Sequence, residues 1–228
     1  MGQCGNVLIT GTSRGIGLAA AIKFLNEGYH VIGMDKEKAP DILTQNENFT
    51  GYMVDVSEKE GLPNLDCKID ILINNAGEQG GKDDIRNNLY SAIYVTEKYA
   101  VEYGIKSILF NASASAVTGY EFPEYVASKG GLIPYMKNVA CRVAKFGATC
   151  NAISCGGVLT ELNRPVIEDK ELWYRIMDVT PLKRWATPEE IADWMFFLTV
   201  NNKFMSGQNL VIDGGEADLN NTFVWPEN

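Results

Sequence analysis

The stretch Val7-Leu8-Ile9-Thr10-Gly11-Thr12-Ser13-Arg14-Gly15-Ile16-Gly17 decides the fold of this chain. Its apolar first part predicts a buried strand, and its glycines predict a sharp turn into a helix. Such a turn lets the backbone approach a pyrophosphate without Cβ atoms in the way. The helix that follows offers free N–H groups and a partial positive charge to phosphates. The stretch therefore favours a dinucleotide site over an ordinary glycine-rich turn.

Short apolar runs alternate with helix-length amphipathic stretches along the whole chain. Runs that are continuous but short are typical of strands covered on both faces by helices, which means a parallel α/β sheet. The predicted strands are residues 6–10, 30–34, 51–54, 69–73, 107–111, 149–153 and 209–212. The predicted helices include residues 17–27, 87–103, 124–146 and 188–198. The last of these opens with Thr187-Pro188-Glu189-Glu190, a typical helix start.

The chain has no shift in composition and no long linker, so we predict a single domain over residues 1–228. The second and third crossovers are short, because nineteen residues lie between Asp35 and Asp55 and eighteen between Asp55 and Asn74. A crossover between parallel strands needs about a dozen residues or more, so these two leave room only for short helices.

The overall charge excludes several classes of partner. A formal net charge of -9 repels phosphate backbones and anionic membrane surfaces, so we expect neither nucleic acid nor membrane as a partner. Five cysteines are scattered without a CxxC pair, and the only histidine is His30. This pattern argues against a metal site or a disulfide framework and favours reduced thiols in the cytoplasm.

Asp35 ends the second predicted strand, where an acid can hydrogen-bond both hydroxyls of an adenosine ribose. The same carboxylate would repel a 2′-phosphate, which favours NAD over NADP. Arg14 and Lys36 argue the other way, since a cation there could neutralise a phosphate. NAD is the predicted cofactor, NADP is not excluded, and a solvated loop acid is the alternative for Asp35.

Several motifs resemble those of the short-chain dehydrogenase/reductase family. They are Thr10–Gly17, Asn74-Asn75-Ala76-Gly77, Tyr125-Val126-Ala127-Ser128-Lys129, residues 181–192 and residues 206–215. They follow the family's order and span nearly the whole chain. The resemblance implies a Rossmann-type doubly wound parallel sheet of about seven strands with helices on both faces. It also implies hydride transfer between a nicotinamide dinucleotide and a small carbonyl or alcohol substrate, in a homodimer or homotetramer.

Tyr125 and Lys129 are four residues apart and therefore neighbours on one helix face. A tyrosine with an ordinary pKa near 10 is a poor base at neutral pH, and a nearby ammonium lowers that pKa by favouring the phenolate. Alone, such a pair is more often a surface coincidence; within the motif it indicates catalysis. By resemblance, Tyr125 is the general acid/base, while Lys129 tunes it and holds the nicotinamide ribose.

The resemblance also implies a serine hydroxyl that stabilises the substrate oxygen and an asparagine that places a relay water. Alignment from Gly119 assigns the serine to Ser113, with Ser115 as the second candidate. The asparagine is Asn88, with its neighbour Asn87 as the alternative and helix capping as the simpler role.

Further cofactor contacts are implied in four groups. They are Gly11, Ser13, Arg14, Gly15, Ile16 and Gly17 at the turn; Asp55 and Val56 beside the adenine; Asn75, Ala76 and Gly77 beside the ribose; and Val158 and Thr160 at the nicotinamide end.

The chain departs from the family's pattern in two places. Cys155-Gly156 stands where relatives have Pro-Gly, and only ten residues separate Gly77 from Asn88. Residues 162–179 match the family's substrate lid, with a packed helix as the alternative. An apolar face of Trp173, Tyr174, Ile176 and Met177 is predicted there.

Two other function classes compete with the oxidoreductase. One is a dinucleotide-binding regulator or scaffold without turnover, which the presence of both Tyr125 and Lys129 disfavours. The other is a nucleotide-sugar epimerase or dehydratase. Those proteins typically have a Gly-x-x-Gly-x-x-Gly pattern at the first turn and a larger carboxyl-terminal region, and this chain has neither.

Overall fold

The computed structural model describes residues 4–101, 104–120 and 122–219, and its centre is a parallel sheet of seven strands. The strands are β1 (Asn6–Thr10), β2 (His30–Asp35), β3 (Phe49–Met53), β4 (Ile71–Asn74), β5 (Ser107–Asn111), β6 (Thr149–Cys155) and β7 (Asn209–Ile212). Their order is β3-β2-β1-β4-β5-β6-β7, and every neighbouring pair is parallel. The predicted doubly wound α/β sheet is confirmed.

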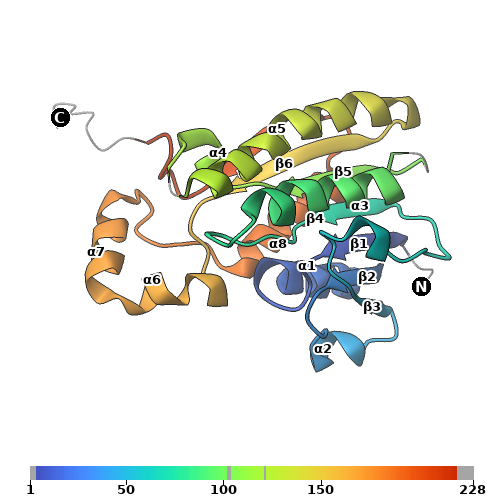
Figure 1. Cartoon of the computed structure of the whole chain (residues 1–228), viewed down its shortest axis with the longest axis horizontal. Helices are drawn as coiled ribbons and strands as arrows, with labels where there is room; N and C mark the ends of the chain where they lie inside the picture. Colours follow the sequence, from blue (N-terminus) through green and yellow to red (C-terminus); the bar gives the residue numbers. More distant parts are fainter. Residues whose placement is uncertain (1–3, 102–103, 121, 220–228) are drawn as a thin grey trace.

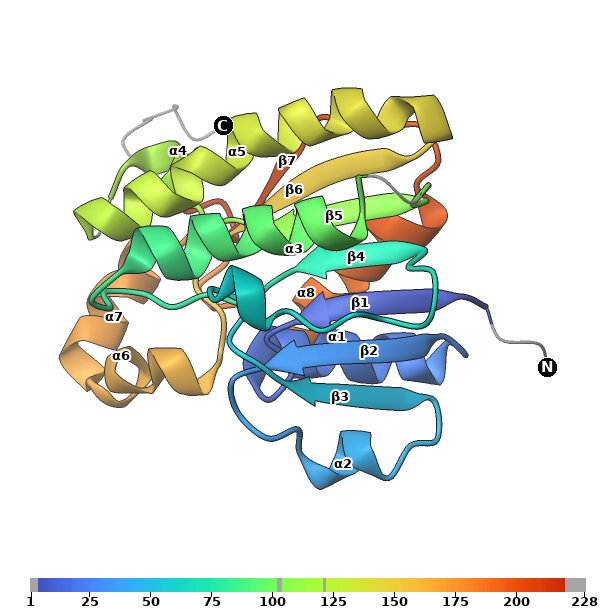
Figure 2. The ribbon, with the colours of Figure 1, turned by 45° about the vertical axis from the view of Figure 1, so that its right-hand side comes forward.

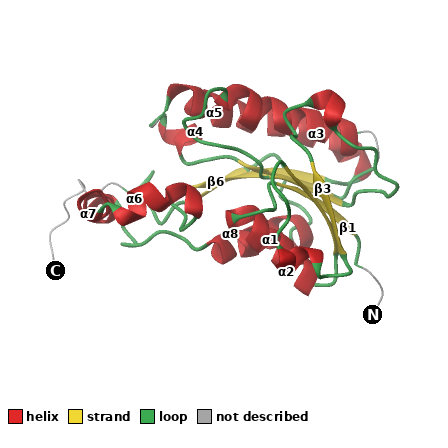
Figure 3. Cartoon of the chain, turned by 60° about the horizontal axis from the view of Figure 1, so that its bottom comes forward, coloured by secondary structure: helices red, strands yellow, loops and turns green. Residues whose placement is uncertain are grey.

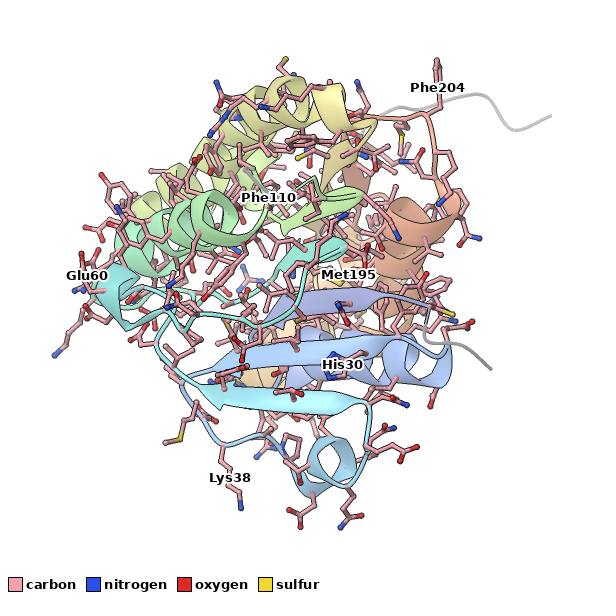
Figure 4. All side chains as sticks on the ribbon, turned by 90° about the vertical axis from the view of Figure 1, so that its right-hand side faces the viewer. His30, Lys38, Glu60, Phe110, Met195 and Phe204 are labelled. Atoms are coloured by element: carbon pink, nitrogen blue, oxygen red, sulfur yellow. The ribbon has the colours of Figure 1, made fainter. Side chains whose placement is uncertain are left out.

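Helices cover both faces of this sheet (Figure 3). Side chains alternate along a strand, so Leu8 of β1 joins the core under α3 (Ser91–Tyr99) and α5 (Pro123–Val143). Its neighbours Val7 and Ile9 join the core under α1 (Gly15–Asn26) and α8 (Pro188–Phe196). Figure 4 shows Phe110 and Met195 in the interior, whereas Phe204 points into solvent.

The two short crossovers contain only short helices, as predicted. The first contains α2 (Asp41–Thr44), and the second contains the 3-10 turn η1 (Lys59–Gly61). Two hydrogen bonds from α3 hold the second connection in place. Lys98 Nζ donates to the carbonyl oxygen of Leu62 at 2.5 Å, and the Tyr99 hydroxyl donates to that of Pro63 at 2.6 Å.

The predicted helix 87–103 is wrong at both ends. A π-helical segment, η2 (Ile85–Tyr90), comes first, and α3 ends at Tyr99. Residues 102–103 lie outside the described residues. Short irregular turns also extend two other helices: η3 (Ala144–Phe146) follows α5 and η5 (Phe197–Asn201) follows α8. Helix α8 opens with the full capping box of Thr187 and Glu190. No helix within the described ranges is long and apolar enough to cross a bilayer.

The remaining helices lie at the carboxyl ends of the strands. They are α4 (Ser115–Thr118), η4 (Glu161–Asn163), α6 (Arg164–Glu168) and α7 (Lys170–Val179). Figures 1 and 2 show α6 and α7 standing apart from the layers, on the side toward which β1 to β4 point.

Helix α7 is amphipathic, but its half-buried face differs in one residue from the prediction. Leu172, Trp173, Ile176 and Met177 are half-buried, whereas Tyr174 is 72% exposed. Helical periodicity explains the correction, because residues 172, 173, 176 and 177 share one face and residue 174 turns away from it. The Trp173 ring packs edge to face against Trp185, with 4.9 Å between the ring centroids.

The first turn leaves no room for a side chain at Gly17, whose added Cβ would lie 1.9 Å from the Gly11 carbonyl oxygen. We expect Gly17→Ala to lower the free energy of unfolding by about 3 kcal/mol or more, because the strand–helix contact must open. Gly130→Ala, in α5, is the matched control, since its Cβ would meet nothing within 4 Å. This control should be neutral or stabilising by up to about 1 kcal/mol. Urea unfolding measures both, and equal stability of the two variants would contradict the contact.

Candidate active site

A cleft of about 940 Å³ opens at the carboxyl ends of the strands. The strand order reverses between β1 and β4, so the loops after these two strands diverge and leave a crevice at this edge. The cleft lies within the size range typical of small-ligand sites.

The glycine turn forms one wall of the cleft. Gly11 and Gly15 have φ angles of 76° and 54°, a backbone region that strongly favours glycine. A Cβ on Gly15 would lie 3.3 Å from Thr160 Cγ2, so Thr160, from the loop after β6, reaches the turn. The sequence therefore fits a backbone cradle that a diphosphate can approach.

The loop after β4 is tied to β1 by hydrogen bonds. The Thr10 hydroxyl accepts from the backbone N–H groups of Asn75 and Ala76 at 3.0 and 2.9 Å. The Asn75 side-chain amide donates to the carbonyl oxygens of Thr10 at 3.0 Å and Gly11 at 3.3 Å. Asn111 of β5 donates in turn to Asn75 Oδ1 at 2.9 Å. The side chains of Thr10 and Asn111 thus hold the floor of the cleft, a role that the sequence analysis did not assign.

Tyr125 and Lys129 lie on the first turns of α5, facing the cleft. Lys129 Nζ is 5.9 Å from the centroid of the Tyr125 ring and donates to the Asn111 carbonyl oxygen at 2.9 Å. Burial lowers the pKa of Lys129 to about 8. The Tyr125 phenol and the Lys129 ammonium are therefore neighbours, as predicted.

The two candidate serines are also in the cleft and touch one another. Both are buried, and their Oγ atoms lie 3.0 Å apart. The Ser115 backbone N–H also donates to Ser113 Oγ at 3.2 Å. Ser113 follows the end of β5, whereas Ser115 begins α4.

The two candidate asparagines have different surroundings. Asn88 is buried, and its side chain accepts from the Glu78 N–H at 2.8 Å. It donates to the Glu78 carbonyl oxygen at 2.9 Å and to Ser128 Oγ at 3.0 Å. Asn87 lines the cleft and donates to the Glu78 carboxylate. Asn88 therefore orders the loop after β4, next to the lysine: a Cβ on Gly77 would lie 2.7 Å from Asn88 Oδ1 and 3.2 Å from Lys129 Nζ.

The structure brings nearly all the predicted site residues to this one cleft. Those that line it are Gly11, Arg14, Gly15, Ile16, Gly17, Asp35, Asp55, Val56, Asn75, Ala76, Gly77, Ser113, Tyr125, Lys129, Val158 and Thr160. The exceptions are Asn88, which lies behind the wall, and Ser13. The Ser13 backbone N–H donates to Asp35 Oδ2 at 2.9 Å, and its hydroxyl donates to the Glu37 carbonyl oxygen at 3.1 Å.

Known proteins are similar to this chain in both sequence and architecture. A family model described as enoyl-(acyl carrier protein) reductase matches residues 11–216. A 3-oxoacyl-[acyl-carrier-protein] reductase of Chlamydia pneumoniae is 31% identical, over 92% of this chain and 95% of that protein. The chain belongs to the short-chain dehydrogenase/reductase family. It is therefore an NAD(P)-dependent oxidoreductase.

Solved structures of similar proteins hold either form of the cofactor. A 4-hydroxyisoleucine dehydrogenase complexed with NADH has a TM-score of 0.86 and 29% identity, covering 93% of this chain and 98% of that one. A 2-deoxy-D-gluconate 3-dehydrogenase of Agrobacterium tumefaciens, described as putative and with bound NADP, has a TM-score of 0.84 and 26% identity. That match covers 94% of this chain and 96% of the other. These matches support a nicotinamide dinucleotide as the cofactor of this short-chain dehydrogenase/reductase.

The adenosine end of the cleft carries paired charges. Arg14 Nη1 lies 3.0 Å from Glu37 Oε1, and Lys36 Nζ lies 3.8 Å from Glu78 Oε2. The sequence analysis assigned no role to Glu37 or Glu78. Glu78 directly follows the motif that ends at Gly77, and Glu37 lies two residues after Asp35. Burial favours a raised pKa for Asp55, but hydrogen bonds from Ser57 and nearby cations outweigh it and lower that pKa.

Cys155 ends β6 as a buried thiol beside the site, with its Sγ 3.6 Å from Asn111 Oδ1. Burial raises the pKa of Cys155 to about 12 despite the nearby Lys129. It is therefore a protonated packing residue at neutral pH.

The buried Lys129 predicts a pH-dependent stability. Its pKa is about 8 in the fold against an ordinary 10.5, so below about pH 8 the folded protein holds a charge that would be better solvated in the unfolded chain. This cost disappears as the pH rises from about 8 to about 10.5, because the folded protein then releases the proton first. Lys129→Met should therefore stabilise the cofactor-free protein by about 1–3 kcal/mol at pH 7, and less at about pH 9.5.

Urea unfolding at the two pH values measures this difference. Lys137→Met is the matched control, because Lys137 is exposed on the same helix. The control should show no comparable change with pH. A wild-type protein more stable than Lys129→Met at pH 7 would contradict the cost of burying the ammonium.

Proposed function

We propose that this protein interconverts a ketone or aldehyde and the corresponding alcohol, with Tyr125 as the general acid/base. The observation that carries the proposal is the convergence of Tyr125, Lys129 and Ser113 on one cleft, with the Lys129 ammonium 5.9 Å from the Tyr125 ring. The cofactor, when bound, supplies or accepts the hydride. The protein then has to position the substrate and move one proton.

In the direction of reduction, the Tyr125 hydroxyl gives its proton to the carbonyl oxygen. The Ser113 hydroxyl donates a hydrogen bond to the same oxygen and stabilises its developing charge. Lys129 favours the phenolate that remains and holds the ribose next to the nicotinamide. Asn88 acts as a positioning residue, since it fixes the backbone of Glu78 beside Lys129.

Residues 162–179 serve in this proposal as the substrate lid. The support is their place: α6 and α7 stand at the mouth of the cleft, and Leu162, Pro165, Val166, Ile176 and Val179 line it. Closing such a segment excludes water from the reacting atoms.

We also place the protein in the cytoplasm as a homodimer or homotetramer. All five cysteines are free, which supports a reducing compartment. The rings of Trp194 in α8 and Phe197 in η5 pack edge to face and are 43% and 49% exposed. This exposed pair supports a self-association surface at the junction of α8 and η5.

Replacing Tyr125 with phenylalanine tests the proposed chemistry. The change removes the transferable proton, so kcat/KM should fall by about 10² to 10⁴, while NADH should bind with nearly unchanged affinity. Loss of reduced-nicotinamide absorbance with a panel of ketones and aldehydes measures turnover, and fluorescence titration measures NADH binding. Full activity in Tyr125→Phe would refute the assignment.

The same assay separates the two serines. Ser113→Ala should reduce kcat by about 10² or more, and Ser115→Ala by less than about tenfold. The reverse order would move the role to Ser115.

NAD is the proposed cofactor, because the two cations that line the adenosine end of the cleft in the described part of the chain each face a carboxylate. Arg14 faces Glu37, Lys36 faces Glu78, and Asp35 adds a negative charge of its own. These carboxylates and a phosphate dianion would repel one another.

The double variant Glu37→Gln/Glu78→Gln tests this arrangement. Releasing both cations should raise kcat/KM with NADPH relative to NADH by roughly three- to tenfold, a modest effect because both pairs are partly exposed. Glu47→Gln, on an exposed loop away from the cleft, controls for overall charge. A wild-type preference for NADPH, or an equal shift in the control, would contradict the proposal.

A further inference from the structure

The outer half of the cleft, beyond Ser113 and Tyr125, has apolar walls on two sides. Tyr120 and Phe122, between α4 and α5, form one wall. Leu162, Val166, Ile176 and Val179, from η4, α6 and α7, form the other. Large apolar side chains that line a concave surface and stay open to solvent offer contact area to a ligand. Here Tyr120 is 75% exposed, Phe122 52%, Leu162 54% and Val179 57%.

The charges in this outer half all have one sign. The lysines and arginines that line the cleft in the described residues are Arg14, Lys36 and Lys129. The first two lie at the adenosine end, and Lys129 is buried beside Tyr125. The acidic residues Asp35, Asp55 and Glu78 also lie at the adenosine end. The charged residues that remain in the lining are Glu161 and Glu216, near the lid.

The other cations near the lid do not line the cleft. Lys170 and Arg175 of α7 are exposed and lie outside its lining. The cations on α6 and on the segment after α7 are engaged elsewhere. Arg164 lies 4.0 Å from Glu168, Lys183 Nζ donates to the Asp178 carbonyl oxygen at 2.7 Å, and Arg184 pairs with Glu190. Residues 1–3, 102–103, 121 and 220–228, which the structure does not describe, contain no lysine, arginine or histidine. These residues can therefore add no cationic side chain to the substrate end.

We propose that the substrate is an uncharged, largely apolar ketone or secondary alcohol, and that the cleft rejects substrates bearing a carboxylate or phosphate. This inference rests on the proposed function. An anion that entered the outer half would lose its hydration against apolar side chains, without a counter-charge, and close to two glutamates. An uncharged apolar group would instead gain from the same walls. The expected class thus differs from the 4-hydroxyisoleucine and the 2-deoxy-D-gluconate named for the two structural relatives, since both of those compounds bear a carboxylate.

Substrates with one carbon skeleton and a remote group of different charge test the proposal. The methyl ester, the carboxamide and the free acid of 4-oxocyclohexanecarboxylate keep the reacting ketone constant, because the varied group is not conjugated with it. Steady-state turnover with NADH should give a kcat/KM at least about tenfold higher for the ester and the amide than for the acid. The amide is polar but uncharged, so it separates charge from hydrophobicity.

Two variants of α7 then locate the effect. Val179→Arg places a cation on the cleft wall and should reduce the amide-to-acid ratio by about threefold or more. Tyr174→Arg adds the same charge on the exposed side of the same helix, away from the cleft, and should leave the ratio as it is.

The outcomes separate this inference from the proposed function. A wild-type enzyme that prefers the acids, or an equal change of the ratio in Val179→Arg and Tyr174→Arg, overturns the substrate class and leaves the chemistry standing. No turnover of any of these ketones with NADH or NADPH, while the reduced nucleotide still binds, overturns the proposed function and this inference with it.

Discussion

A continuous run of hydrogen bonds joins the two ends of the cleft, and the site depends on it. Lys129 donates to the backbone of Asn111, Asn111 donates to Asn75, and Thr10 accepts from the backbone of Asn75 and Ala76. The run thus passes from α5 across β5 and β4 to the glycine turn after β1. Because all these strands are parallel, their carboxyl ends meet at one edge and such short polar side chains can reach one another. A displacement at either end is transmitted to the other through fully bonded groups.

The sequence predicted the parts of this arrangement that are encoded locally. The strands, the glycine turn, the helix start at Thr187 and the Tyr125–Lys129 spacing each depend on residues within a few positions. Each is present in the structure, with strand ends shifted by at most two residues. The role of Asn111 could not be predicted in the same way. It depends on which strands become neighbours, and one asparagine at a strand end looks like any other before the strand order is known.

Other differences have the same physical origin. Tyr174 fits an apolar pattern by residue type, but its position in the helical period turns it to solvent. The π-helical segment before α3 places Asn88 against Glu78 and Ser128, contacts 10 and 40 residues apart in the chain. Hydrogen bonds over such distances select an irregular backbone that local propensity does not indicate. Lys36 and Glu78 likewise meet only because β2 and β4 both flank β1.

The two ends of the cleft are supported in different ways. At the substrate end, Lys129 and Ser113 are buried against helices and strands with fixed side-chain contacts. At the adenosine end the crossovers contain only the short helices α2 and η1, and partly exposed ion pairs lie on the loop surface. Exposed pairs contribute little to folding, so residues there can change with small cost in stability. Cofactor preference can consequently vary in this scaffold without disturbing the acid/base group, whereas a change near Lys129 alters both stability and chemistry.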